Sequence, residues 1–237
     1  MILAGLSLLA VGGADLIRQF LPPTRRWMVQ VAAALVLLLV ASGFDAAVWA
    51  FVATAVAVVW VFVVPSDGSG RAGFWPVAGL AVLCAAAVST VGLREATGPL
   101  GDVWQISGPN GVVHPDAAIL LVGTIAFLLE SGNVIVRTAL REEAVADDRD
   151  EEGEPGLKGG RLIGPLERVL VFALTLAGAY TLLAAVLAAK GIVRFPEISR
   201  DTATGNRAEY FLVGSLVSWV AALASALLVW WAFATLL

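Results

Sequence analysis

Residues 210–237 read YFLVGSLVSWVAALASALLVWWAFATLL and contain no charged side chain. A helix needs ~20 mostly apolar residues to cross the ~30 Å hydrocarbon core of a bilayer, so this segment is long enough to span a membrane. Five further runs have the same character, with Glu130 as their only charge: residues 27–44, 46–66, 72–93, 117–136 and 169–189. The pattern predicts an all-α, polytopic integral membrane bundle.

The composition supports this fold class and excludes several functions. Of the 237 residues, 59% are apolar and 14% are charged, whereas soluble domains carry about 25% charged residues. The chain has one His and one Cys, which removes most nucleophile–base pairs. It has no phosphate-binding glycine loop, no zinc-protease motif and no basic cluster typical of nucleic-acid binding. We therefore expect no cofactor and no nucleic-acid partner, and we lean against an enzyme.

The N-terminal segment and the charged links complete the predicted topology. Residues 2–17 are apolar but are interrupted by Asp15, and Arg18 follows them, so we expect a seventh, short or tilted span. Nine Arg and Lys residues fall in the links after the first, third and fifth segments, against five in the other two links. The positive-inside rule places the first group in the cytoplasm.

Three regions are expected along the chain. Residues 1–140 form an N-terminal membrane half of four to five spans, with an outer loop at 94–116 that carries a small hairpin. Residues 141–160 form an acidic, Gly-rich cytoplasmic linker, because positions 142–154 alone have a net charge of −7. Residues 161–237 form a C-terminal helical pair. In the outer loop His114, the only histidine, is read as a turn residue in preference to a metal ligand with Asp102 and Asp116.

Three polar residues lie deep inside the span at 117–136 or just beyond it. Glu130, Asn133 and Arg137 stand at positions i, i+3 and i+7, so a helix places them on one face. A charge at mid-bilayer costs at least ~2.5–3.5 kcal/mol, so Glu130 is expected to meet Arg137 through Asn133, to meet a basic residue of another helix, or to be protonated. Two readings stay open: a polar lining for a substrate or proton path, and a structural interhelical pair.

Charged residues also mark both ends of the next span. We expect one helix from Pro165 to about residue 194, ~45 Å long, with Glu167 and Arg168 at the inner interface. Lys190 and Arg194 then lie at the outer interface, either as anchors or as an anion or lipid-phosphate site. Glu209, at the start of the last span, is expected within salt-bridge reach of Lys190 or Arg194. The small residues Gly214, Ser218 and Ala222 would seam these last two helices, or an oligomer.

One resemblance extends over residues 159–220. The stretch Gly159-Gly160-Arg161-Leu162-Ile163-Gly164-Pro165-Leu166-Glu167-Arg168, followed by Ala189-Lys190, Arg194-Phe195, Glu209-Tyr210 and Gly214-Ser215, resembles an uncharacterised bacterial family of polytopic membrane proteins, a domain of unknown function. That family's pattern is GxxIGxLER, then AK, RF and EYxxIGT, and Ser215 replaces its threonine. The resemblance implies a bacterial inner (plasma) membrane protein in which Glu167, Arg168, Lys190, Arg194 and Glu209 form a set. It implies no activity.

The leading functional hypothesis is binding or passage of a small polar or anionic solute, or of a lipid headgroup, within the helix bundle. The candidate residues are those with unexplained charge or polarity: Glu130, Asn133, Arg137, Glu167, Arg168, Lys190, Arg194 and Glu209. The first alternative is a non-catalytic membrane subunit that docks a cytosolic protein through residues 142–154. The second is a lipid-modifying membrane enzyme with Glu130 or Glu167 as acid–base.

Overall fold

The structure is a computed structural model that describes residues 1–65, 73–90, 94–108, 111–146, 160–199 and 206–234. Within those ranges, the side chains at 107, 108, 111, 141–146, 160, 161, 194–199 and 206–210 are not described. The acidic run at 147–154 lies outside the described residues, so its predicted docking role stays a prediction.

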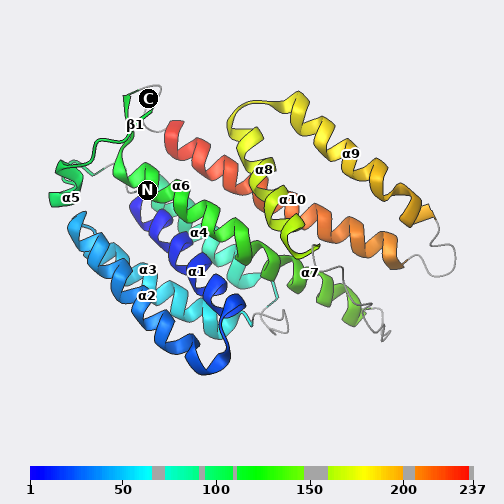
Figure 1. The fold of residues 1–237 in the computed structure, drawn as a ribbon, viewed down its shortest axis with the longest axis horizontal. Helices are drawn as coiled ribbons and strands as arrows, with labels where there is room; N and C mark the ends of the chain where they lie inside the picture. The colour runs from blue at the N-terminus through cyan, green and yellow to red at the C-terminus, as the bar shows by residue number, and fades with distance from the viewer. Residues whose placement is uncertain (66–72, 91–93, 109–110, 147–159, 200–205, 235–237) are drawn as a thin grey trace.

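The described chain is almost entirely helical, as predicted. Its elements are α1 (Ile2–Phe20), α2 (Pro23–Gly43), α3 (Ala47–Val63), α4 (Trp75–Thr90), α5 (Gly98–Asp102), β1 (Ser107–Gly108), β2 (Gly111–Val112), α6 (Pro115–Ala126), the π-helix η1 (Phe127–Ser131), α7 (Gly132–Ala146), α8 (Gly160–Leu176), α9 (Tyr180–Ser199) and α10 (Asn206–Ala234). The helices α6, η1 and α7 run on without a break, so they form one long rod (Figure 1).

The N-terminal helix α1 lies at the centre of the bundle, between α6 and α3 (Figure 1). Two glycines let it approach α6 closely: a Cβ on Gly5 would lie 2.7 Å from the Leu120 nitrogen, and one on Gly12 would lie 2.5 Å from the Ala126 carbonyl carbon. Contacts between small residues of this kind drive helix packing in membranes. Because residue numbers rise together along this contact, α1 and α6 run in parallel.

Four helices are long and apolar enough to cross a membrane: Ile2–Phe20, Pro23–Gly43, Pro115–Leu140 and Phe211–Ala234. The first of them is the segment that the sequence predicts as short or tilted, and it is an unbroken helix of 19 residues. Three further apolar helices are shorter, Ala47–Val63, Trp75–Thr90 and Tyr180–Val193. The structure thus supports a helical membrane protein with four candidate spans.

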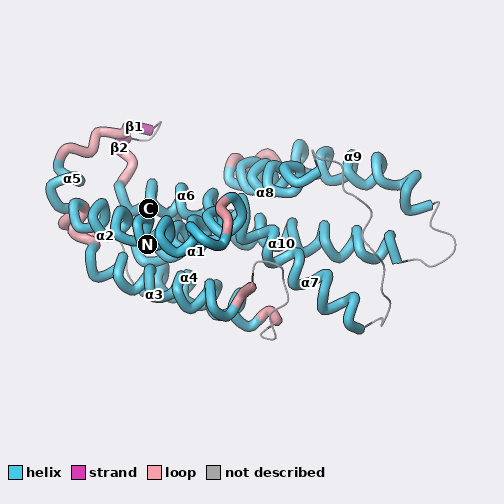
Figure 2. The backbone as a smooth tube through the Cα atoms, turned by 60° about the horizontal axis from the view of Figure 1, so that its bottom comes forward, coloured by secondary structure: helices cyan, strands magenta, loops and turns pink. Residues whose placement is uncertain are grey.

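The predicted long helix from Pro165 to about residue 194 is wrong. The chain leaves α8 after Leu176 and enters α9 at Tyr180, and Gly178 between them has φ +66°. This left-handed conformation suits glycine and ends helices, and the Ala179 N–H closes the turn by donating to the Leu174 oxygen at 2.9 Å. The result is a helical hairpin (Figure 2), so the C-terminal region holds three helices in place of the expected pair.

The last helix, α10, packs against α7 and α8, with little contact to α9. Its small-residue stripe faces inward: Gly214 lies beside Leu140 and Val136 of α7, and Ala222 is fully buried. Of the contacts expected between α10 and the preceding helix, those with α8 are therefore present and those with α9 are few. Since Gly214 meets the far end of α7, α10 runs antiparallel to the α6–α7 rod and ends near the start of α1 (Figures 1 and 2).

The outer loop contains the predicted hairpin, in a minimal form. Strands β1 and β2 pair antiparallel over two residues each, with Ser107 opposite Val112. The Trp104 indole N–H donates to the Val113 oxygen at 2.7 Å, and its ring packs edge-on against Phe44. The hairpin is thereby tied to the end of α2.

Candidate functional site

The candidate site is built on the π-helix η1 in the middle of the α6–α7 rod. In an α-helix the Gly132 N–H would bond to the Leu128 oxygen, but here it bonds to Phe127, one residue earlier. The Leu128 carbonyl therefore lacks its helical partner. Such π-bulges are frequent at functional sites, and this one frees a backbone acceptor inside the bundle.

Glu130, within η1, meets Arg137, which is the first of the three possibilities that its position left open, and it does so directly as well as beside Asn133. One carboxylate oxygen accepts from Arg137 Nη2 at 2.6 Å, and the other accepts from Asn133 Nδ2 at 3.0 Å. Arg137 Nε also donates to the Asn133 backbone oxygen at 3.2 Å. The ion pair is asymmetric in exposure, because the Glu130 side chain is buried whereas that of Arg137 is 38% exposed. The cluster therefore reaches from the bundle interior to its surface.

Arg168 of α8 completes this cluster from another helix. Its Nε donates to the freed Leu128 oxygen at 2.8 Å, its Nη2 to Asn133 Oδ1 at 2.5 Å and its Nη1 to Ser218 Oγ of α10 at 3.3 Å. The residue is 1% exposed. Gly132 makes the space, since a Cβ there would lie 2.5 Å from Arg168 Nε. Three elements, η1–α7, α8 and α10, thus converge on one guanidinium.

The charge balance of Arg168 differs from that of the other buried charges. Among the described residues, Asp15 pairs with Arg18, Asp116 with Arg94, and Glu130 with Arg137. Arg168 forms no ion pair with any carboxylate in the described part of the chain, and its three acceptors are all neutral. Glu130 and Glu167 attract this charge at longer range, but no described carboxylate contacts it. A buried charge without a contacting counter-ion is costly.

Glu167 of α8 and Lys190 of α9 face each other across the α8–α9 hairpin. Lys190 Nζ donates to Glu167 Oε2 at 2.5 Å, and it also lies 5.5 Å from the ring centroids of Phe211 and Trp219 in α10. The prediction that these charges occupy opposite interfaces is therefore wrong, because the turn at Gly178 folds α9 back on α8. The side chains of Arg194 and Glu209 are outside the described residues, so the predicted Glu209 contact is not tested.

A second polar cluster was not predicted as a site. Asp15 of α1 accepts from Arg18 Nη2 at 2.7 Å, from Trp60 Nε1 of α3 at 3.0 Å and from Ser131 Oγ at 2.7 Å. Arg18 in turn donates to the Val64 oxygen at the end of α3. The sequence signal was the pair of opposite charges three residues apart in an apolar helix. These contacts join α1, α3 and η1 and pair both charges, although Arg18 Nε is buried without a hydrogen-bond partner.

The end of the bundle that carries the β1–β2 hairpin holds a further ion pair. Arg94 donates to both oxygens of Asp116, at 2.6 and 3.1 Å, and also to the Phe44 oxygen. His114 caps α6, with its Nδ1 accepting from the Asp116 N–H at 3.2 Å. No group of metal-ligating residues large enough to hold an ion is found among the described residues. His114 and Asp116 thus serve a helix start and a loop closure.

The chain matches no family model, no curated protein and no solved structure. The resemblance of residues 159–220 to a bacterial membrane family therefore stays a prediction. The functional argument rests on the geometry of the polar clusters alone.

Proposed function

We propose that this protein is a multi-pass membrane protein that binds an anionic group, a phosphate or a carboxylate, at Arg168 within its helix bundle. The observation that carries this proposal is the missing ion pair: of the charged residues described as buried, Arg168 alone has no described side chain of opposite sign in contact with it. An anion at this point would balance the charge of the cluster. The anion belongs either to a small solute or to a lipid headgroup.

The chemistry of the guanidinium supports this assignment. Arginine presents five N–H donors in a planar fork that matches carboxylate and phosphate oxygens. Leu128, Asn133 and Ser218 engage three of them, which leaves one N–H on each Nη atom. These two donors are the contacts that an anion would gain.

The approach to Arg168 is from the α7–α8 side. Arg137 is partly exposed there, and Gly164 of α8 places no side chain between Asn133 and Arg168, where a Cβ would be in ordinary contact with Asn133 Oδ1 at 3.5 Å and Arg168 Nη1 at 3.7 Å. An incoming anion would meet Arg137 first, and Arg168 next. Two cations met one after the other favour passage of the anion as well as its binding, as in anion pores lined by Arg and Lys.

The α8–α9 hairpin also supports an orientation in the bacterial inner membrane. It returns the chain to the side where α8 begins, so the four cations at 190, 194, 200 and 207 join the nine that the positive-inside rule assigns to the cytoplasm. Thirteen Arg and Lys residues then lie on that side or near it, against Arg94 alone on the other, with Arg168 inside the bundle. This asymmetry is far stronger than nine against five. Of the predicted six to seven spans, six form part of this proposal: the four candidate spans together with α3 and α4. The hairpin enters and leaves on the same side and adds no net crossing.

Anion binding is tested on purified protein in an uncharged detergent. Titration calorimetry with inorganic phosphate in a chloride buffer measures the solute arm, and nanodiscs of phosphatidylglycerol against phosphatidylcholine measure the lipid arm. We expect Arg168→Gln to lower the affinity for the ligand that binds, phosphate or phosphatidylglycerol, by about tenfold or more. The reason is that charge-assisted hydrogen bonds contribute ~1.5–3 kcal/mol each. The control Arg25→Gln removes one exposed charge at the start of α2 and should leave the solute arm unchanged.

Two results would overturn the proposal. The first is a wild-type protein that responds to neither arm. The second is a folded Arg168→Gln variant with unchanged affinity for the anion. If Arg168→Gln does not fold, Ser218→Ala provides a milder variant that keeps the charge. A response in only one arm would decide between a solute and a lipid headgroup.

A further inference from the structure

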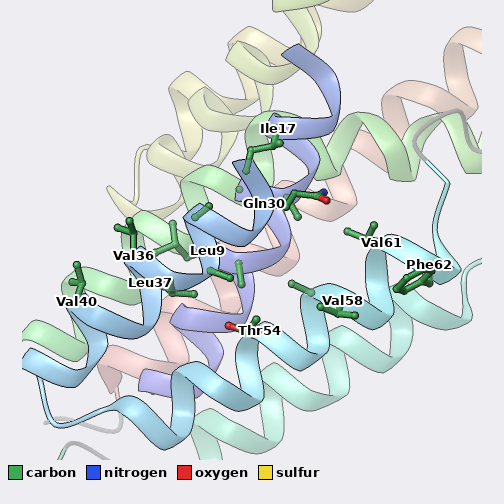
Figure 3. Close-up of a pocket in the computed structure, with 16 residues that line it drawn as sticks. Leu9, Ile17, Gln30, Val36, Leu37, Val40, Thr54, Val58, Val61 and Phe62 are labelled. Carbon is green, nitrogen blue, oxygen red and sulfur yellow. The ribbon is translucent and has the colours of Figure 1, made fainter. Parts of the chain in front are cut away.

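A groove of about 490 Å³ lies between α1, α2 and α3, and none of the residues that line it comes from the helices around Arg168 (Figure 3). It exists because α2 packs loosely: Ala41 is the one buried residue of that helix. Small side chains on the facing surfaces, such as Gly13 of α1, Ala33 of α2 and Ala57 of α3, widen the gap. A void of this size forfeits its van der Waals contacts unless something fills it.

The wall of the groove is aliphatic, with two polar side chains. Thr54 donates to the Ala50 oxygen of its own helix at 2.8 Å. Gln30 differs, because its Nε2 is buried and has no hydrogen-bond partner. Figure 3 shows Gln30 near Ile17 at one end of the groove. A buried amide donor without an acceptor is costly, so a ligand oxygen at this point would stabilise the groove.

A cation lies one turn before this amide, on the same face of α2. Arg26, Gln30, Ala33 and Leu37 are spaced by four, three and four residues, which a helix aligns in one stripe. Arg26 is in the first turn of α2, and its Nε bonds to the Leu21 oxygen. Along the stripe, Gln30 follows Arg26 by ~6 Å, and the groove continues ~15 Å further to Val40. The order is therefore cation, amide donor, apolar channel.

We propose that the groove between α1, α2 and α3 binds one anionic phospholipid, with its phosphate at Arg26, an ester carbonyl at Gln30 and an acyl chain along Gly13, Ala33 and Leu37. The polarity of such a lipid has the same order as the stripe. The ester oxygen accepts from the Gln30 amide, and the chain fills the apolar volume. This site is independent of the anion site at Arg168, which lies on other helices.

The decisive variant fills the groove without disturbing the protein. A Cβ on Gly13 meets no atom within 4 Å, so Gly13→Leu should place its side chain in the channel. Gly79→Leu is the matched control, because Gly79 is also helical, exposed and unobstructed but does not line the groove. Protein purified in dodecyl maltoside is mixed with phosphatidylglycerol, and bound lipid is counted by native mass spectrometry.

We expect Gly13→Leu to lower the apparent affinity for phosphatidylglycerol about tenfold, with Gly79→Leu unchanged. Gln30→Leu should lower it for both phosphatidylglycerol and phosphatidylcholine, because both carry esters. Arg26→Gln should erase the preference for phosphatidylglycerol, whereas Arg25→Gln, about 100° away on the helix, should keep it. In an Arg168→Gln background, Gly13→Leu should still lower phosphatidylglycerol binding relative to Gly79→Leu, which separates this site from the anion site.

Three outcomes would overturn the proposal. Wild-type protein that binds the two lipids equally would remove the anionic headgroup from it. Unchanged lipid binding in both Gly13→Leu and Gln30→Leu would place the lipid elsewhere. A dimer that dissociates in Gly13→Leu would identify the occupant as a helix of a second copy.

Discussion

At the residue scale, the fold depends on how charges are neutralised in an apolar bundle. The buried charges are satisfied in different ways: Glu130 pairs with a cation of its own helical rod, Asp15 combines an ion pair with indole and hydroxyl donors, and Arg168 has three neutral acceptors. The arrangement at Arg168 is possible because the π-helix frees the Leu128 carbonyl and Gly132 leaves space for the guanidinium. Arg168 is consequently held in place but not neutralised, and this is why it carries the functional proposal.

Gly132→Ala should therefore damage the site although alanine favours helices by ~1 kcal/mol over glycine. Its Cβ would lie 2.5 Å from Arg168 Nε, and overpacking typically costs 1–3 kcal/mol. Gly164→Ala is the matched control, with its nearest contact at 3.5 Å, and should be neutral or stabilising. Thermal unfolding in detergent compares them, and equal stability of the two variants would contradict the packing around Arg168.

The Asp15 cluster gives a second test at this scale. Asp15→Ala leaves the buried Arg18 without its carboxylate, which should cost about 3–5 kcal/mol. The double variant Asp15→Ala/Arg18→Leu should recover part of this loss, because no unpaired charge remains. Unfolding free energies provide the measurement, and a double variant whose loss equals the sum of the single losses would show that the two side chains do not interact.

At the element scale, the α8–α9 hairpin decides which charges meet. The pairing of Glu167 with Lys190 follows from one turn at Gly178. The apolar run at 169–189 hid this turn, because its hydropathy is continuous. A glycine with no further breaker is a weak stop signal, and only the left-handed backbone at Gly178 shows that the helix ends.

The hairpin makes a distance prediction. Spin labels at Ile163 and Val193, both exposed, would be ~45 Å apart on one straight helix. In the hairpin they lie near the same end, so double electron–electron resonance should report well under half of that distance. A distribution centred near 45 Å would restore the single long helix and remove the Glu167–Lys190 pair.

The sequence was most informative about elements and least about contacts between them. Apolar runs located α1 to α4 and α10 to within a few residues, but the run at 169–189 merged α8 and α9 into one helix. The i, i+7 spacing offered the Glu130–Arg137 pair as one of three possibilities, because both residues lie on one helical rod. The partners of Asp15 are 45 and 116 residues away, and no local pattern encodes them. The acceptor on Leu128 depends on a local π-bulge that helical periodicity does not reveal.

At the scale of the whole molecule, the hairpin fixes where the last helix begins. It places the starts of α8 and α10 at the same end of the bundle, and α10 ends near the start of α1 (Figure 1). The links before α8 and before α10 are then expected on the cytoplasmic side, together with most of the positive charge.

Thiol labelling in whole cells tests this topology. In a Cys84→Ala background, Asp148→Cys and Ala203→Cys should both react with an impermeant reagent only after the cells are opened, whereas Asp102→Cys in the outer loop should react in intact cells. A single long helix would place position 203 on the outside. Labelling of Ala203→Cys in intact cells, with Asp148→Cys protected, would contradict the hairpin topology.

Anion binding at Arg168 is tested most directly by a high-resolution map of the wild-type protein in phosphatidylglycerol nanodiscs, recorded in phosphate buffer. We expect density for a phosphate-sized anion, free or on a headgroup, within hydrogen-bonding distance of the Arg168 Nη atoms on the α7–α8 side. A guanidinium enclosed by Leu128, Asn133 and Ser218 alone, with no anion beside it, would contradict the claim and leave Arg168 with a purely structural role.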